Sequence, residues 1–228
     1  MQIADSGYKI ITDLSGAKDE IYALIEKVGR TCYKSESKGT PESAARFIEN
    51  IVKRKHLGLL EHALMTVEFN VDRGVTHEAV RHREASFAQE STRYCNYSKG
   101  KFGNHITVIN IDGGMDIDPT MQDLSDDVKL EIWHEWKEGC ADAERRYMRM
   151  LNLGCSPQIA RSVLPTGLAS TIMVTANLRE WRHIFALRAL EMTGPVHPQM
   201  LEVMLPLYKE CLKIMPEVFD NIGEADIE

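Results

Sequence analysis

Basic, hydroxyl and amide side chains are concentrated in residues 81–94, which read RHREASFAQESTRY. Guanidinium groups carry a fixed charge and a planar fork of donors that matches phosphate and carboxylate oxygens. The neighbouring hydroxyls and amide add groups that can hold an anion and read a polar ring. A run of charges is more commonly a solvated helix face. Here, however, the apolar positions of residues 74–80 recur at helical spacing and lead the segment into a core.

A zinc site is one alternative for the imidazole and carboxylate groups near this segment. The helix of a zinc hydrolase carries two histidines four positions apart, which places both on one face. Four positions after His77 stands Arg81, and His82 lies five positions away, rotated off that face. A zinc deaminase would need a Pro-Cys-x-x-Cys partner, which the sequence lacks. We therefore expect no metal.

Nucleophilic side chains also lie in and near the segment. Cys95 follows Arg93 by two residues, and Cys32 also has cationic neighbours in sequence, a setting in which a thiol can become reactive. No general base pairs with Ser91 by sequence, so we expect this serine to bind rather than to attack. A thiol-dependent transferase that uses Cys95 remains an open alternative at this point.

Two further clusters of polar residues lie outside the segment. Residues 177–188 read as a helix. Arg179 and His183 lie at a spacing that can share one face, and Arg182 and Arg188 can join that face less squarely. His56, Glu61 and His62 lie at a junction between a helix and a strand. A metal site is conceivable there, but histidines that simply form hydrogen bonds are the commoner arrangement.

The composition is that of an ordinary globular protein. With 228 residues, 43% hydrophobic and 27% charged, the chain suits one domain, which we place at residues 1–228. No apolar run approaches the length of a bilayer span, and the first residues lack the pattern of a secretory signal. Five scattered cysteines without a CxxC pair argue against a disulfide framework and favour the cytoplasm. The net charge of -7 argues against general nucleic-acid affinity but not against a small anion in an arginine-lined cleft.

Hydrophobic periodicity and cap signals predict the elements that must position these groups. Helices are expected at residues 16–28, 41–55, 126–153, 156–161, 177–188 and 198–215, and strands at 64–71, 106–111 and, buried, 168–176. Gly29 and Gly154 should end their helices, while Thr40, Ser156 and Asn177 should cap the start of theirs. Loops are expected at residues 30–40, 95–104 and 112–119, and the acidic tail at 221–228 is expected to fray.

Several motifs in register resemble one enzyme family. Arg81-His82-Arg83, followed after seven residues by Ser91, resembles the signature of the flavin-dependent thymidylate synthases, and Ser91-x-Arg93-Tyr94 extends it. The later landmarks resemble that family in the same order: Ala160-Arg161-x-x-Leu164-Pro165, Asn177-x-Arg179, Leu187-Arg188 and His197-Pro198-Gln199. The resemblance covers about residues 30–205.

The resemblance implies both a fold and a reaction. The fold would be a single α+β domain, with mixed helices and a small, mostly antiparallel sheet. The absence of a GxGxxG motif agrees with the implied non-Rossmann flavin site. The reaction would convert dUMP to dTMP, with 5,10-methylenetetrahydrofolate as carbon donor and FAD, reduced by NADPH, as hydride source. The family forms its site between subunits of a homotetramer and requires no cysteine, so Cys95 and Cys32 would be structural.

The resemblance also assigns roles to residues. Arg188 would activate uracil electrostatically, as the catalytic group. The dUMP site would comprise Glu78, Arg81, Gln89, Ser91, Arg93, Arg161 and Arg188. The FAD site would comprise His56, Glu61, Arg81, His82, Arg83, Glu84, Asn177, Arg179 and His183. Glu78, Gln89 and His183 stand at positions where members of the family can differ. The competing interpretations are a nucleotide-binding module without redox chemistry and a merely structural basic face.

Overall fold

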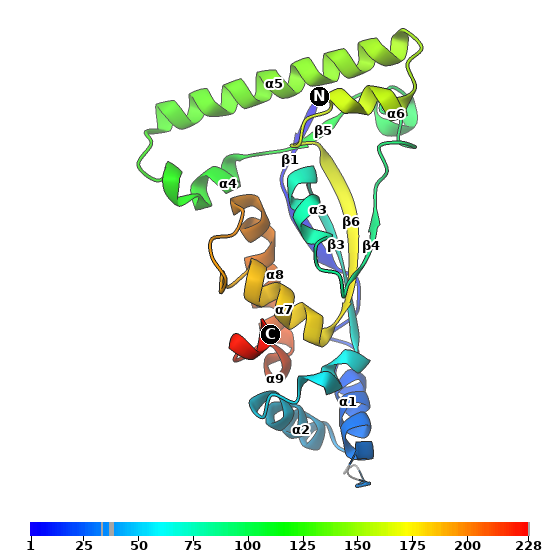
Figure 1. Ribbon diagram of the computed structural model, residues 1–228, viewed down its shortest axis with the longest axis vertical. Helices are drawn as coiled ribbons and strands as arrows, with labels where there is room; N and C mark the ends of the chain where they lie inside the picture. Colours follow the sequence, from blue (N-terminus) through cyan, green and yellow to red (C-terminus); the bar gives the residue numbers. More distant parts are fainter. Residues whose placement is uncertain (33, 37–38, 228) are drawn as a thin grey trace.

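A four-stranded antiparallel sheet runs through the centre of the molecule (Figure 1). The computed structural model describes residues 1–32, 34–36 and 39–227. The sheet has the order β2-β3-β6-β4, and a separate parallel pair joins β1 to β5. The strands are β1 (Gln2–Ala4), β2 (Gly7–Ile10), β3 (Leu64–Asp72), β4 (Ser86–Gln89), β5 (Thr107–Ile109) and β6 (Ala169–Asn177). The expected α+β fold with a mostly antiparallel sheet, and without a Rossmann unit, is confirmed.

The pairing of β3 with β6 is the longest in the sheet. Nine residue pairs join the strands, from Leu64 opposite Asn177 to Asp72 opposite Ala169. At about 3.4 Å per residue, this ladder is about 30 Å long. Alternate side chains are buried on both strands, so the strand at 168–176 is half-buried rather than fully buried. The buried positions join one core with α7 and α8, in which the Trp181 indole donates to the Met65 carbonyl at 2.9 Å.

Strand β4 was not predicted from the sequence. It is short, only its alternate residues are partly buried, and it lies inside a polar run. Its place in the sheet comes from pairing with β6, where Ser86 faces Thr175 and Gln89 faces Ile172. The spacer between Arg83 and the serine of the motif is therefore largely extended. The two ends of the motif, Arg83 and Ser91, consequently lie far apart along β6. The short strands β1 and β2 were also missed.

Among the described residues, six helices agree with predicted ones, with shifted ends: α1 (Lys18–Cys32), α2 (Pro41–Lys53), α5 (Asp126–Asn152), α6 (Pro157–Ala160), α7 (Leu178–Arg188) and α8 (Pro198–Ile214). Helix α3 (Arg73–Ala79) lies where the sequence shows helical spacing, whereas α4 (Asp112–Ile117) and α9 (Pro216–Phe219) were not predicted. The caps are confirmed at Thr40, which accepts from the Ser43 amide, and at Asn177, which accepts from the Glu180 amide. Ser156 makes no capping bond with its side chain.

One predicted helix end and one predicted loop are wrong for physical reasons. Gly29 lies inside α1 and is buried, because the ring of Phe47 occupies the space where a side chain would stand. The loop expected at 30–40 thus begins only after Cys32, and its residues 33, 37 and 38 lie outside the described residues. The loop expected at 112–119 contains α4, whose two glycines approach side chains of α8. Gly154 does end α5, with a φ of 91°.

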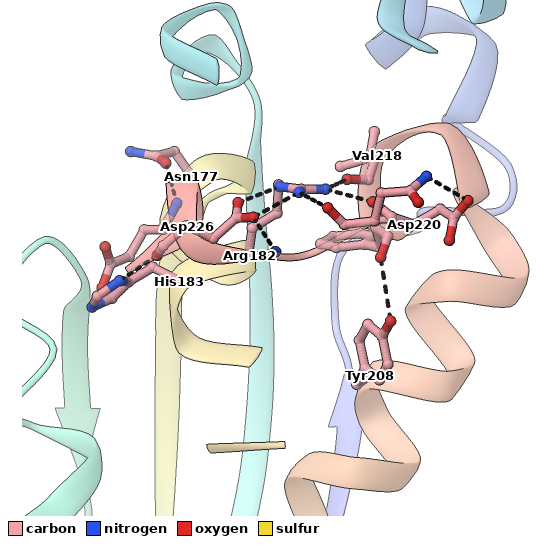
Figure 2. A network of polar contacts seen from close by, with 11 residues as sticks. Asn177, Arg182, His183, Tyr208, Val218, Asp220 and Asp226 are labelled. Carbon is pink, nitrogen blue, oxygen red and sulfur yellow. Dashed lines mark hydrogen bonds and ion pairs between the residues drawn. The ribbon is translucent and has the colours of Figure 1, made fainter. Parts of the chain in front are cut away.

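The C-terminal tail is held in place, and the prediction that it frays is wrong for residues 221–227. Asp226 is buried, and its carboxylate binds both Nε and Nη2 of the buried Arg182, at 2.6 and 2.9 Å (Figure 2). The sequence pattern places Arg182 on α7 but gives no sign of a partner 44 positions away. Removing one partner of a buried ion pair costs about 3–5 kcal/mol, since it leaves an uncompensated charge.

The long helix α5 lies across one end of the molecule (Figure 1). Of its residues only Cys140 and Tyr147 are buried, in a second, smaller core that includes Ile106 and Leu168. None of the helices in the described part of the chain combines the length and hydropathy that a membrane-spanning segment needs.

We expect the two helical glycines Gly29 and Gly139 to respond oppositely to alanine. A Cβ at Gly29 would lie 2.3 Å from Cζ of Phe47, whereas nothing lies within 4 Å of a Cβ at exposed Gly139 in α5. Gly29→Ala should therefore lower the free energy of unfolding by about 1–3 kcal/mol. Gly139→Ala should raise it by about 0.5–1 kcal/mol. Urea unfolding measures both, and equal changes would contradict the burial of Gly29.

Candidate active site

A guanidinium at the end of α7 meets the histidine of the central motif. The Nε of Arg188 donates to Nε2 of His82 at 3.2 Å, and its Nη1 donates to the Glu78 carboxylate at 3.1 Å. Glu78 lies near the end of α3, a helix capped by the side chain of Asp72. These contacts join the ends of α3 and α7 with the turn that follows α3. Both Nη2 hydrogens of Arg188 lack a partner among the described residues, so this side of the fork is available to a ligand.

The contact with Arg188 determines which nitrogen of His82 carries the proton. Guanidinium groups only donate, so Nε2 of the neutral ring must accept and Nδ1 must hold the hydrogen. Nδ1 lies 3.6 Å from Oε1 of Glu180, and both side chains are buried. A buried carboxylate needs compensating donors. Sequence reasoning missed Glu180, because an acidic residue in the first turn of a helix is ordinarily explained by the helix dipole.

His183 completes a compact group with His82 and Glu180. One nitrogen or oxygen of each residue lies within 4.8 Å of the others, and the two imidazole rings meet edge to face at 5.9 Å. Such a trio has ligand types that bind zinc. The fixed positive charge of Arg188 beside His82, together with the proton on Nδ1 of that ring, disfavours a cation. The absence of a metal stays a prediction.

A pocket of about 380 Å³ opens beside this group. Five of its lining residues were selected from the sequence as flavin contacts: Glu61, Glu84, Asn177, Arg179 and His183. The structure therefore brings together these candidates from three separate segments of the chain. Arg179 is about half exposed and forms an ion pair with Glu61 at 2.6 Å. Ala225 and Asp226 of the C-terminal turn complete the wall.

Arg182 does not share the face of α7 that carries Arg179 and His183. Its side chain is buried and directed into the C-terminal turn, as Figure 2 shows. Helical spacing predicted that Arg182 lies near that face. This prediction is wrong, because the partners of Arg182 are in the C-terminal turn.

A second pocket, of about 510 Å³, lies at the other end of the β3–β6 ladder. Arg161 lines it and donates from Nη1 to the hydroxyl of Thr92 at 3.2 Å. Arg93 donates from Nε to Gln158 at 3.2 Å, and its amide contacts the hydroxyl of Ser91 at 3.3 Å. The structure thus brings the three phosphate candidates of the sequence to one side of the molecule. Thr92 and Gln158 were missed, since neither carries a charge that would single it out.

The two pockets are separated along β6. The amide of Glu90 donates to the carbonyl of Thr171, six residues before Asn177. At about 3.3 Å per residue, the distance is about 20 Å, longer than a mononucleotide. In this single chain, the nucleotide-phosphate candidates and the flavin candidates therefore do not converge on one ligand.

Other candidates from the sequence lie apart from both pockets or have local roles. Arg81 and Arg83 are exposed, and no ion pair of theirs is found among the described residues. His56 precedes the 3-10 turn η1 (Leu57–His62), is exposed, and lines neither of these two pockets. Gln89 donates to the hydroxyls of Thr76 and Ser170 at 2.9 and 3.0 Å. Its amide therefore joins α3 to β6, which leaves the carbonyl oxygen as its free acceptor.

Cys95 is not activated as a nucleophile. Burial raises the pKa of the Cys95 thiol, and the nearby Glu90 carboxylate raises this pKa further, by repulsion and by accepting a hydrogen bond. The backbone of Ser91 and the charge of Lys101 oppose this without reversing it. The attacking species of a cysteine is the thiolate, so a raised pKa makes this thiol a poor nucleophile.

Comparisons with known proteins agree on one family. The model of the family described as "Thymidylate synthase complementing protein" matches residues 14–217. A flavin-dependent thymidylate synthase of Corynebacterium diphtheriae is 34% identical over 214 residues, covering 90% of this chain and 78% of that protein. One of Mycobacterium avium is also 34% identical, over 216 residues, covering 90% and 79%. The crystal structure of PolB, a UMP/dUMP methylase of Streptomyces cacaoi, bound with 5-Br dUMP, shares the fold, with a TM-score of 0.77 at 20% identity and 96% of each chain covered.

We expect the thiol of Cys95 to react slowly with iodoacetamide. At pH 8 a raised pKa leaves little thiolate, and Cys95 is only partly exposed whereas Cys32 is exposed. Mass spectrometry of tryptic peptides should show alkylation of Cys95 at least several-fold slower than that of Cys32. The difference should narrow as the pH rises. Faster labelling of Cys95 would restore the thiol-dependent alternative.

Proposed function

Because this chain belongs to the family of flavin-dependent thymidylate synthases, we propose that it converts dUMP to dTMP by reductive methylation. The resemblance noted in the motifs is thereby confirmed over most of the chain. The chain is an enzyme of a flavin-using family. PolB, with a similar fold, methylates UMP and dUMP by its name. That activity supports the substrate proposed here.

The observation that carries the proposal is the fixed position of Arg188. Activation of uracil for attack at its ring places negative charge on the ring oxygens, and a donor already aimed at that charge stabilises it most. His82 and Glu78 hold Nε and Nη1 of this guanidinium, so its orientation does not have to be established during the reaction. The free Nη2 donors are the ones we assign to the uracil oxygen. Glu180 supports the arrangement through His82.

The second pocket supplies the chemistry for the nucleotide phosphate. Arg161 lines this pocket, Arg93 reaches its edge through Gln158, and the hydroxyl of Ser91 accepts from the amide of Arg93. Arginine pairs with phosphate through two parallel hydrogen bonds, which fix orientation as well as charge. Gln89, held by Thr76 and Ser170, offers a carbonyl acceptor near the same strand end. Glu78 and Arg81 complete the proposed dUMP site.

The donor set of the first pocket suits part of a flavin dinucleotide. Arg179 offers charge to a diphosphate, Glu61 and Glu84 offer acceptors to hydroxyl and amino groups, and His183 offers a ring nitrogen. His56, His82, Arg83 and Asn177 are the remaining proposed contacts, together with Arg81. When bound and reduced by NADPH, FAD would supply the hydride, and 5,10-methylenetetrahydrofolate would supply the carbon. At about 380 Å³ the pocket encloses a fragment of such a molecule, so another surface must complete the site.

The flavin pocket is too small for the whole cofactor, and the phosphate candidates lie too far from the flavin candidates. A homotetramer with sites between subunits would account for both observations. The phosphate candidates lie about 20 Å along the sheet from the flavin candidates, as the strand spacing requires. A neighbouring subunit could place its own phosphate pocket beside the Arg188 of this chain. Exposed Arg81 and Arg83 would then face the partner rather than water. A cytoplasmic location belongs to the same proposal, in keeping with cysteines that are all free.

Substitution of Arg188 should damage the chemical step selectively. Arg188→Ala should lower kcat/KM for dUMP by about 10²–10³-fold, the usual effect of removing one donor to a developing oxyanion. Arg188→Lys should not restore the rate, because one ammonium cannot hold His82, Glu78 and uracil in a planar fork. Steady-state formation of dTMP measures these effects. Arg46→Ala, on the exposed face of α2, is the matched control and should retain activity. A wild-type rate in Arg188→Ala would refute the assigned role.

A mixture of two inactive variants should regain activity if subunits share each site. Arg161→Ala removes the phosphate pocket and Arg188→Ala removes the uracil contact, so mixed tetramers would contain some sites with both residues intact. Co-expression with two affinity tags isolates such tetramers, and dTMP formation measures recovery. The pair Arg161→Ala and Arg93→Ala is the control, because both residues serve the same pocket and every site would lack one of them. Recovery in neither mixture would contradict the shared site.

A further inference from the structure

The C-terminal turn is built around one buried guanidinium. Arg182 is 1% exposed, and its donors reach the Asp226 carboxylate and the carbonyls of Asp220 at 3.0 Å, Asn221 at 3.2 Å and Val218 (Figure 2). A buried charge is costly unless it is paired and hydrogen-bonded, and this one has four partners. The backbone from the end of α9 to Asp226 is therefore wrapped around a fixed point on α7.

The Asp226 carboxylate also fixes its own turn. Its second oxygen accepts from the amide of Gly223 at 2.9 Å, which closes the 3-10 turn η5 (Glu224–Asp226). This turn separates two hollows. Ala225 and Asp226 line both the pocket that holds Arg179 and His183 and another hollow of about 720 Å³ on the side of α2. The turn is thus a thin wall of the proposed flavin pocket.

The wall contacts one side chain of that pocket directly. The carbonyl oxygen of Asp226 lies 2.7 Å from Nδ1 of His183. A carbonyl can only accept, so Nδ1 must carry a proton, and Nε2 of the neutral ring is left as an acceptor. Figure 2 shows the second ring nitrogen on the side away from the turn. Free imidazole has no such constraint, and which nitrogen is protonated in a protein is set by the bond that the other makes.

The neighbouring charged groups do not reverse this arrangement. Glu180 and His82 face the same imidazole, within the group whose polar atoms lie inside 4.8 Å. His82 already directs its Nδ1 proton to Glu180, because Arg188 occupies its Nε2. A donor other than His183 therefore faces the Glu180 carboxylate, at 3.6 Å. The lone pair on Nε2 of His183 is left for the pocket.

We propose that the C-terminal turn sets the hydrogen-bonding role of His183, so that its Nε2 accepts a hydrogen bond from an N–H of a bound isoalloxazine ring. Asp226 and Arg182 are then positioning residues, which act on the cofactor through His183. The inference rests on the proposed flavin site. It goes beyond the motifs, because neither Asp226 nor the turn belongs to any of them.

The affinity of the apoprotein for FAD tests this coupling. Asp226→Ala should weaken FAD binding about tenfold, an effect of the size found between contacting residues. Glu224→Ala, two residues earlier on the exposed side of the same turn, is the matched control and should bind as wild type does. In a His183→Ala background the Asp226→Ala effect should disappear. Quenching of flavin fluorescence measures each affinity. If Asp226→Ala does not fold, Asp226→Asn, which keeps an oxygen acceptor for Arg182, enters the same cycle.

A cofactor-free measurement separates this inference from the proposed function. Long-range proton–nitrogen correlation of histidine-labelled apoprotein should show His183, identified by its loss in His183→Gln, protonated at Nδ1. An Nε2-protonated ring, or an Asp226→Ala effect that persists without His183, would overturn the inference while leaving the flavin site standing. If the wild-type chain takes up no FAD, both the proposed function and the inference fail.

Discussion

Nine antiparallel residue pairs between β3 and β6 determine where the candidate groups lie. At one end of this ladder, Asp72 begins α3 and Thr92 lies near Arg161, while at the other end Asn177 begins α7. A shift of one residue in the pairing would move every buried side chain to the opposite face, so the hydrophobic core enforces this register. The distance between the phosphate and flavin candidates is therefore as rigid as the sheet. This rigidity is the reason for proposing a site shared between subunits.

The sequence predicts those elements whose signals are local. Alternation over residues 64–71 and the caps at Thr40 and Asn177 act within a few positions, and each of these predictions is confirmed. Strand β4 and the C-terminal turn were missed for the opposite reason. The first depends on hydrogen bonds to β6, more than 80 positions away, and the second on Arg182. The acidic composition of the tail predicted exposure to solvent. The cation that pairs with Asp226 is Arg182, which lies on a helix distant in sequence.

The same division applies to the site. The motifs selected most residues of the first pocket but only Arg161 among the candidate ligands that line the second, since arginine and histidine are recognised by residue type alone. They could not reveal Glu180, whose importance comes from burial beside His82. They also could not reveal which imidazole nitrogens are protonated. In the structure two such assignments follow from fixed neighbours, Arg188 for His82 and the Asp226 carbonyl for His183. The first of these partners belongs to a motif, whereas the second, in the C-terminal turn, does not.

The most direct test of the proposed reaction is the visible absorption spectrum of the purified protein with FAD, recorded without oxygen. The account predicts flavin bands that travel with the protein, bleach on addition of NADPH, and shift when dUMP is added, because cofactor and nucleotide share one site. A protein that remains colourless after incubation with FAD, or whose flavin spectrum is indifferent to dUMP, would contradict it. The arginines of residues 81–93 would then constitute an anion-binding surface without redox chemistry.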